Sequence, residues 1–108
     1  TTHWAYVDLL PLVGATHENA RVVRDGHVVT AGGVTSGIDF AFSLVADLAG
    51  AEVAQAIQLG LEYDPSPPFD TGHPGKAAET AVALMRHRNE TAHEGIRRAL
   101  GSGSSPAK

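Results

Sequence analysis

Two pairs of valines around a turn constrain the fold of this 108-residue chain more than any other feature. In "ARVVRDGHVVTAGG" the pairs flank a segment centred on Asp25 and Gly26. An Asp-Gly pair readily supplies the positive φ angles that a tight hairpin turn needs. The spacing therefore predicts two antiparallel strands, at about residues 20 to 24 and 27 to 31.

Helical patterns surround this hairpin. Before it, the sequence predicts a short helix or turn that ends at Gly14. After it, a helix is expected from residue 35 or 36 to residue 49, with Ser36 and Asp39 as a variant of the capping box and Gly50 as the stop. A shorter helix in "AEVAQAIQLG" is expected to lead into a possible strand at residues 61 to 63, and a last helix to cover about residues 76 to 100.

The number of strands is small for the number of helices. Three or four short strands and four helices would leave apolar faces on both sides of a sheet, and a parallel α/β sheet usually has more strands. The chain is therefore interpreted as half of a fold. Residues 1 to 100 are expected to belong to a single domain, and residues 101 to 108, "GSGSSPAK", to form a flexible tail.

Composition narrows the class of protein. With 43% hydrophobic and 19% charged residues the chain is typical of a soluble globular protein. A net charge of −4 and the absence of a basic patch argue against a nucleic-acid partner, and no apolar stretch is long enough to span a membrane. We therefore expect a cytoplasmic location. Because there are no cysteines, disulfides, thiolate metal sites and a cysteine nucleophile are absent from this chain.

The glycine-rich stretch "TAGGVTSGIDF", residues 30 to 40, has two readings. In the functional one, backbone N–H groups around Val34 to Gly37 at the start of a helix point at a nucleophile, an anion or a developing charge. In the structural one, the glycines only permit a tight turn from strand to helix. The glycine spacing does not match the dinucleotide-binding fingerprint.

Other polar clusters give weaker signals. The six histidines lack metal-ligand spacing, so no metal site is predicted. Asp39 and Asp47 are conceivable as an acid and a base, but they are expected on the polar side of a helix. The run "MRHRNETAHEGIRR" is interpreted as a solvated helix face with pairs such as Arg86 with Glu90. The loop "DPSPPFDTGHPG" is expected on the surface, where Phe69 would contact a neighbour.

Three blocks of sequence carry a family resemblance. "TTHW", "VTAGGVTSGIDFAFSLV" and "LEYDPSPPFDTGHP" resemble the C-terminal half of ThiJ/PfpI proteins, within the class I glutamine amidotransferase-like superfamily. The chain is particularly similar to their isonitrile hydratase branch, from residue 1 to about residue 100. The resemblance implies an α/β fold, the C-terminal half of a flavodoxin-like three-layer α/β/α sandwich with a β-hairpin and flanking helices.

The resemblance also implies an activity. The family uses a cysteine on a turn between a strand and a helix, and that residue would lie upstream of Thr1, so no catalytic residue is expected on this chain. Such a branch member converts an isonitrile to an N-substituted formamide through a cysteine thioimidate, without a cofactor. The residues expected to line the pocket are Thr2, His3, Trp4, Gly33, Val34 and Thr35.

Partners and alternatives follow from the same resemblance. The expected partners are the N-terminal half with its cysteine, as a separate chain that stays associated, a small isonitrile, and a second copy in a homodimer. Expression of this half alone is the other explanation of the truncated pattern. Alternative functions are the ligand-sensing domain of an AraC-type transcriptional regulator and a glyoxalase-like or peptidase-like activity on the same scaffold.

Overall fold

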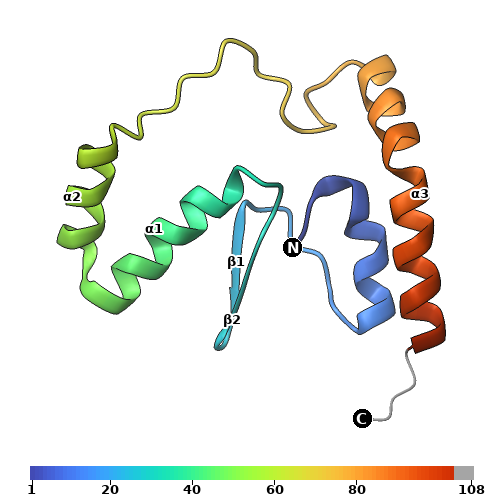
Figure 1. Cartoon of the computed structure of the whole chain (residues 1–108), viewed down its shortest axis with the longest axis horizontal. Helices are drawn as coiled ribbons and strands as arrows, with labels where there is room; N and C mark the ends of the chain where they lie inside the picture. The colour runs from blue at the N-terminus through green and yellow to red at the C-terminus, as the bar shows by residue number, and fades with distance from the viewer. Residues whose placement is uncertain (104–108) are drawn as a thin grey trace.

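The computed structural model describes residues 1–103 of the chain. In chain order its elements are the 3-10 helix η1 (Trp4–Val13), the strands β1 (Val22–Asp25) and β2 (Val28–Ala31), and the α-helices α1 (Ser36–Ala49), α2 (Ala51–Leu61) and α3 (Glu79–Gly103) (Figure 1).

The two strands form the predicted antiparallel hairpin. Val22 pairs with Ala31, and Asp25 with Val28. The turn between them has Gly26 at a φ of 64°, a backbone conformation that side chains with a Cβ disfavour. Within residues 1–103 this two-stranded sheet is the whole of the β structure, so the prediction of three or four strands is wrong.

The third strand, expected at residues 61 to 63, is replaced by the end of a helix. Leu61 is the last residue of α2, and Glu62 adopts a left-handed conformation with a φ of 52°. The next N–H, of Tyr63, donates to the Gln58 carbonyl at 3.0 Å. These bonds belong to a helix-terminating turn, which leaves no extended segment to join a sheet.

The helices agree with the predictions in position, with changes at their ends. η1 ends at Gly14, and α1 ends before Gly50, as expected. α3 begins at Glu79, later than expected, and the Lys76 N–H before it closes a turn on the His73 carbonyl, at 2.9 Å. It continues through residues 101 to 103 of the predicted tail, whose remainder lies outside the described residues. No helix in the described part has the length and apolar run that crossing a membrane requires.

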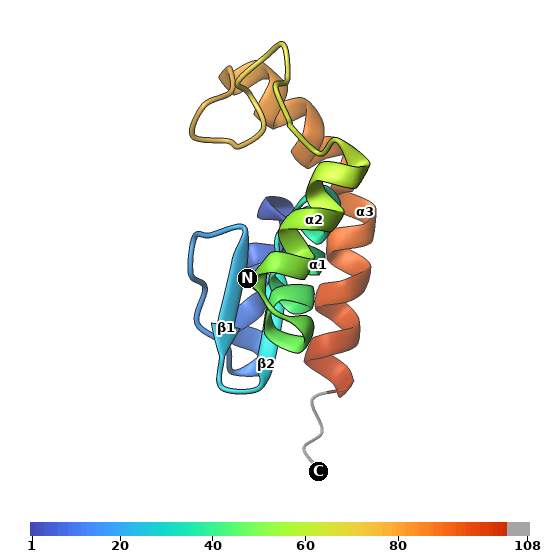
Figure 2. The ribbon, with the colours of Figure 1, turned by 90° about the vertical axis from the view of Figure 1, so that its left-hand side faces the viewer.

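The elements form two groups joined by a long loop. β1 and β2 contact α1, which packs on α2, whereas η1 packs against α3. Figure 1 shows α1 and α2 on one side, η1 and α3 on the other, and the α2–α3 loop arching between them. In the view at 90° the same loop lies at the end of the molecule opposite the hairpin turn (Figure 2).

This arrangement buries little apolar surface. Among the described residues the buried hydrophobic side chains are those of Ala5, Leu9 and Ala54. The chain exposes 7987 Å², whereas a compact monomer of this mass exposes ~5,700 Å². Its radius of gyration is 16.7 Å, against ~13 Å for a compact domain of this length. The chain by itself therefore lacks the core of a compact domain.

Several exposed apolar side chains belong to the α1–α2 pair. Val53, Ile57 and Leu61 recur every four residues on α2 and are all exposed, Leu61 by 69%. At the end of α1, Leu48 is 78% exposed. A helix face with this spacing normally packs on another element. We call these four residues the α1–α2 apolar face.

Candidate functional site

The N-terminal segment lies against the turn between β2 and α1. Gly32 donates its N–H to the Arg21 carbonyl at 2.9 Å, which extends the hairpin by one bond. A Cβ on Gly32 would meet the Ser36 hydroxyl at 3.2 Å and the Thr2 carbonyl at 3.8 Å. Segments 30 residues apart in the sequence are thus brought within van der Waals distance, which places Thr2 and His3 beside the glycine turn.

His3 has a defined orientation in this site. Its Nδ1 accepts the N–H of Ala5 at 3.1 Å and so caps η1. Its ring edge faces Gly33, because a Cβ on that glycine would lie 3.2 Å from His3 Cδ2 and 4.0 Å from Nε2. The absence of a side chain at position 33 is what lets the imidazole approach the backbone.

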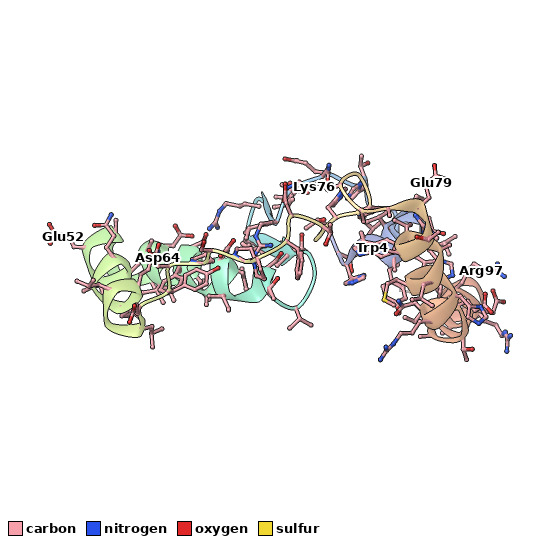
Figure 3. The ribbon with its side chains drawn as sticks, turned by 90° about the horizontal axis from the view of Figure 1, so that it is seen from above. Trp4, Glu52, Asp64, Lys76, Glu79 and Arg97 are labelled. Atoms are coloured by element: carbon pink, nitrogen blue, oxygen red, sulfur yellow. The ribbon has the colours of Figure 1, made fainter. Side chains whose placement is uncertain are left out.

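Trp4 covers the other side of His3. The two rings stack with centroids 5.5 Å apart and an interplanar angle of 28°. Arg86 of α3 lies over the indole, with its guanidinium carbon 5.1 Å from the ring centroid. Figure 3 shows Trp4 on the side of η1 that faces α3. The predicted pocket residues Thr2, His3, Trp4 and Gly33 therefore lie together.

The start of α1 is more exposed than the pocket prediction implies. Val34 is 95% exposed and Thr35 is also exposed, whereas Ser36 is 3% exposed. The Ser36 N–H donates to the Gly33 carbonyl at 2.8 Å, and the Gly37 N–H to the Val34 carbonyl at 3.1 Å. Half of the N–H groups expected to point at a ligand are therefore already used within the turn.

The expected capping box at Ser36 and Asp39 does not form. Thr35 is the N-cap residue and makes no side-chain capping bond, while Ser36 is buried against Gly32. Asp39 instead accepts hydrogen bonds from Tyr63 and Arg21, each at 2.6 Å. These charged and hydroxyl donors come from outside the helix and replace the local bond.

The two bonds change the titration of Asp39. The hydrogen bond from Tyr63, followed by that from Arg21, holds the pKa of Asp39 below its usual range. The same bond to Asp39 raises the pKa of Tyr63. Arg21 also donates to the Thr35 carbonyl at 3.1 Å. This cluster fixes the hairpin and the segment after α2 to the first turns of α1, so Asp39 has a structural role here.

Asp47, the other carboxylate considered as an acid or base, pairs with Arg24 of β1. Asp47 is exposed, as expected, whereas the side chain of Asp39 is 35% exposed. Both aspartates therefore hold the hairpin on α1. Among the described residues, no group of three or more histidine, aspartate or glutamate side chains is placed to hold a metal ion.

The interpretation of the α3 sequence as a solvated face is wrong in part. Tyr6 donates to Asn89 at 2.9 Å, and His93 Nε2 lies 3.0 Å from both carboxylate oxygens of Asp8. Arg86 lies on Trp4, while its expected partner Glu90 lies near His87, at 3.3 Å. The signal was present in the spacing, since residues 85, 89 and 93 share one helix face.

A surface hollow lies beside this contact, away from the glycine turn. It has a volume of about 490 Å³ and is lined by Ala5, Asp8, Ala83, Arg86, His87, Asn89, Glu90 and His93. None of the six predicted pocket residues lines it. The hollow is therefore separate from the residues predicted to line a pocket.

Two comparisons show which known proteins this chain is similar to, while no family model matches it. The crystal structure of a ThiJ/PfpI family protein from Pseudomonas syringae superposes with a TM-score of 0.86 at 38% identity, over 93% of this chain and 42% of that one. An isonitrile hydratase from Pseudomonas putida is 54% identical over 88 residues, 82% of this chain and 39% of that protein. This chain is ThiJ/PfpI-like and isonitrile hydratase-like.

The ThiJ/PfpI resemblance and the α/β fold class predicted from the sequence are thereby confirmed. The helices and the small antiparallel sheet form part of the flavodoxin-like α/β fold of that family. The ThiJ/PfpI-like chain spans about two fifths of the length of each relative.

Proposed function

We propose that this chain forms part of an enzyme that hydrates an isonitrile to an N-substituted formamide. The observation that carries the proposal is the 54% identity to an isonitrile hydratase over 82% of the chain. The nucleophile would be a cysteine on an N-terminal half that associates with this chain. That half would also cover the α1–α2 apolar face, whose exposure is atypical of a monomer.

The reaction divides into an addition and a hydrolysis. The cysteine sulfur bonds to the terminal carbon of R–N≡C, and that carbon takes up a proton to give the thioimidate R–N=CH–S–Cys. Water then adds to the same carbon while the nitrogen takes a proton. The C–S bond breaks, the formamide R–NH–CHO leaves, and the thiolate is regenerated. In sum, one isonitrile and one water give one formamide.

The residues of this chain would shape the site of that addition. His3 would stand beside the sulfur, with Gly33 leaving room for the approach, and Trp4 would contribute an apolar surface. Thr2, Val34 and Thr35 complete the proposed wall, with Val34 and Thr35 meeting the N-terminal half. The proximity of Thr2, His3 and Gly33 supports this placement. The homodimer and the cytoplasmic location remain predictions from the sequence.

The activity is tested on this chain assembled with an N-terminal half that carries the cysteine. A small alkyl isonitrile is added and formamide is measured by mass spectrometry, with a Cys→Ser form of the N-terminal half as the control. We expect turnover with the cysteine and none with the serine. An assembled protein with an intact cysteine but no turnover would contradict the proposal and favour the ligand-sensor or glyoxalase-like alternatives.

A further inference from the structure

A stack of three side chains connects α3 to the glycine turn. Arg86 lies over Trp4, Trp4 stacks on His3, and the edge of His3 faces Gly33. The outer layer belongs to α3 and the inner one contacts the start of the β2–α1 turn. Arg86, more than 80 residues from His3 in the sequence, is thus placed to influence how the imidazole contacts that turn.

The hydrogen-bond partner of His3 defines its tautomer. The Ala5 N–H can only donate, so Nδ1 must offer its lone pair. The neutral ring then carries its hydrogen on Nε2. Nε2 lies on the edge that faces Gly33, 4.0 Å from where a Cβ there would be. The ring therefore presents an N–H donor on the side of the turn.

Other contacts hold η1 on α3 without Arg86. The Tyr6 hydroxyl bonds to Asn89, and His93 pairs with Asp8. Removing the guanidinium should therefore leave α3 docked and affect mainly the indole beneath it. A cation over the face of an indole is held by the negative charge of the π system.

We propose that Arg86 is a positioning residue, which acts through Trp4 to hold the His3 Nε2–H as a hydrogen-bond donor to the reacting thiolate beside Gly33. The thiolate in this statement rests on the proposed function; the stack and the tautomer do not. His3 is the residue that would touch the reacting sulfur. Arg86 reaches neither sulfur nor substrate and acts only by keeping the two rings stacked.

The first test is NMR of the purified protein that carries this chain, labelled with ¹⁵N-histidine, with His3 assigned by its loss in His3→Gln. We expect a protonated Nε2 and an unprotonated Nδ1. Arg86→Met should shift the His3 ring resonances, and Arg86→Lys should shift them less because a cation remains. Arg88→Met is the matched control, because Arg88 is exposed on α3 and makes no side-chain bond within the described residues. A His3 ring protonated on Nδ1, or resonances that Arg86→Met leaves unmoved, would overturn the proposal.

The second test uses turnover of an isonitrile by the assembled protein. Arg86→Met should lower kcat about three- to fivefold with KM within about twofold, as expected when a transition-state contact is loosened. Arg88→Met should match the parent. Unchanged kcat in Arg86→Met would overturn the positioning role. If the parent shows no turnover at all, the proposed function fails, and the NMR result still decides the stack.

Discussion

The glycine turn and the α1–α2 apolar face differ in how far the chain itself supplies partners for their side chains. At the turn, Ser36 is 3% exposed, His3 rests on Gly33, and no buried side-chain polar atom in residues 1–103 lacks a hydrogen-bond partner. On the helix pair, Leu48 and Leu61 face solvent over most of their surface. The buried polar side chains thus have hydrogen-bond partners within the described residues, whereas these apolar side chains remain largely exposed.

The difference has a physical origin. A turn is fixed by a few hydrogen bonds and by close contacts that neighbouring segments can supply. An apolar helix face needs an opposing surface, because the hydrophobic stabilisation is proportional to the area removed from water. The polar contacts at the glycine turn are therefore made within this chain, whereas the apolar side chains of α1 and α2 stay exposed in it.

The strongest way to break this comparison is to supply the opposing surface. Addition of the proposed N-terminal half should cover the α1–α2 apolar face and raise the free energy of unfolding by about 5 kcal/mol or more, the range of a complete domain. Circular dichroism during urea titration should change from a broad to a sharp transition, and binding of an apolar dye should fall. A sharp transition and no dye binding for this chain alone would contradict the expectation.

A single truncation on the apolar face should give the next largest effect. Leu61→Ala removes an exposed side chain from the isolated chain, so its cost there should be within about 0.5 kcal/mol. In the assembled protein the same side chain should be buried, and its loss should cost about 2 to 3 kcal/mol. Urea midpoints of both forms measure the difference. Glu52→Ala, at an exposed position of α2 (Figure 3), is the control that should cost little in either. Equal small losses for Leu61→Ala in both forms would place Leu61 outside the interface.

A methyl group at the glycine turn tests the other half of the comparison. In Gly33→Ala the new Cβ would start 3.2 Å from His3 Cδ2, so the ring must move by a few tenths of an ångström. A displaced donor should reduce kcat for isonitrile hydration about tenfold. Gly37→Ala is the matched control, since a Cβ there meets nothing within 4 Å. Equal kinetics for the two variants would show that the approach of His3 to Gly33 is unimportant for turnover.

The smallest expected effect concerns the bonds of Asp39. Because its pKa is lowered in the folded chain, its contribution to stability is present above the unfolded value and is lost as pH falls through the folded value. Asp39→Asn should therefore cost about 0.5 to 1 kcal/mol near pH 7, a small value because the pair is solvent-accessible. The difference should shrink as the pH falls below the unfolded value of about 3.9 and disappear below the folded one. Urea unfolding of the assembled protein at both pH values measures it, and a loss independent of pH would contradict the ionic origin.

Much of the fold could be predicted from local sequence, and much of the site could not. The hairpin could be predicted from an Asp-Gly turn between valines. Helix α1 could be predicted from apolar residues that recur at helical spacing. The strand expected at residues 61 to 63 failed because three residues cannot distinguish a strand from the end of a helix. The capping box failed because Asp39 has stronger donors, 18 and 24 residues away in the sequence.

The contacts around His3 also join residues that are far apart in the sequence. Nothing local indicates that His3 meets Gly33, and the family resemblance alone grouped them. Arg86 was paired with Glu90 by helical spacing, but its guanidinium lies over the indole of Trp4. The contribution of α3 to the site was missed because its sequence is mostly polar, which hides the face formed by residues 85, 89 and 93.

Native mass spectrometry of the purified protein tests most directly whether this chain is one part of a divided site. We predict a complex in which the 11.2 kDa chain is bound to a second segment that contains a cysteine. A lone 11.2 kDa species with the narrow charge distribution of a compact monomer would contradict this.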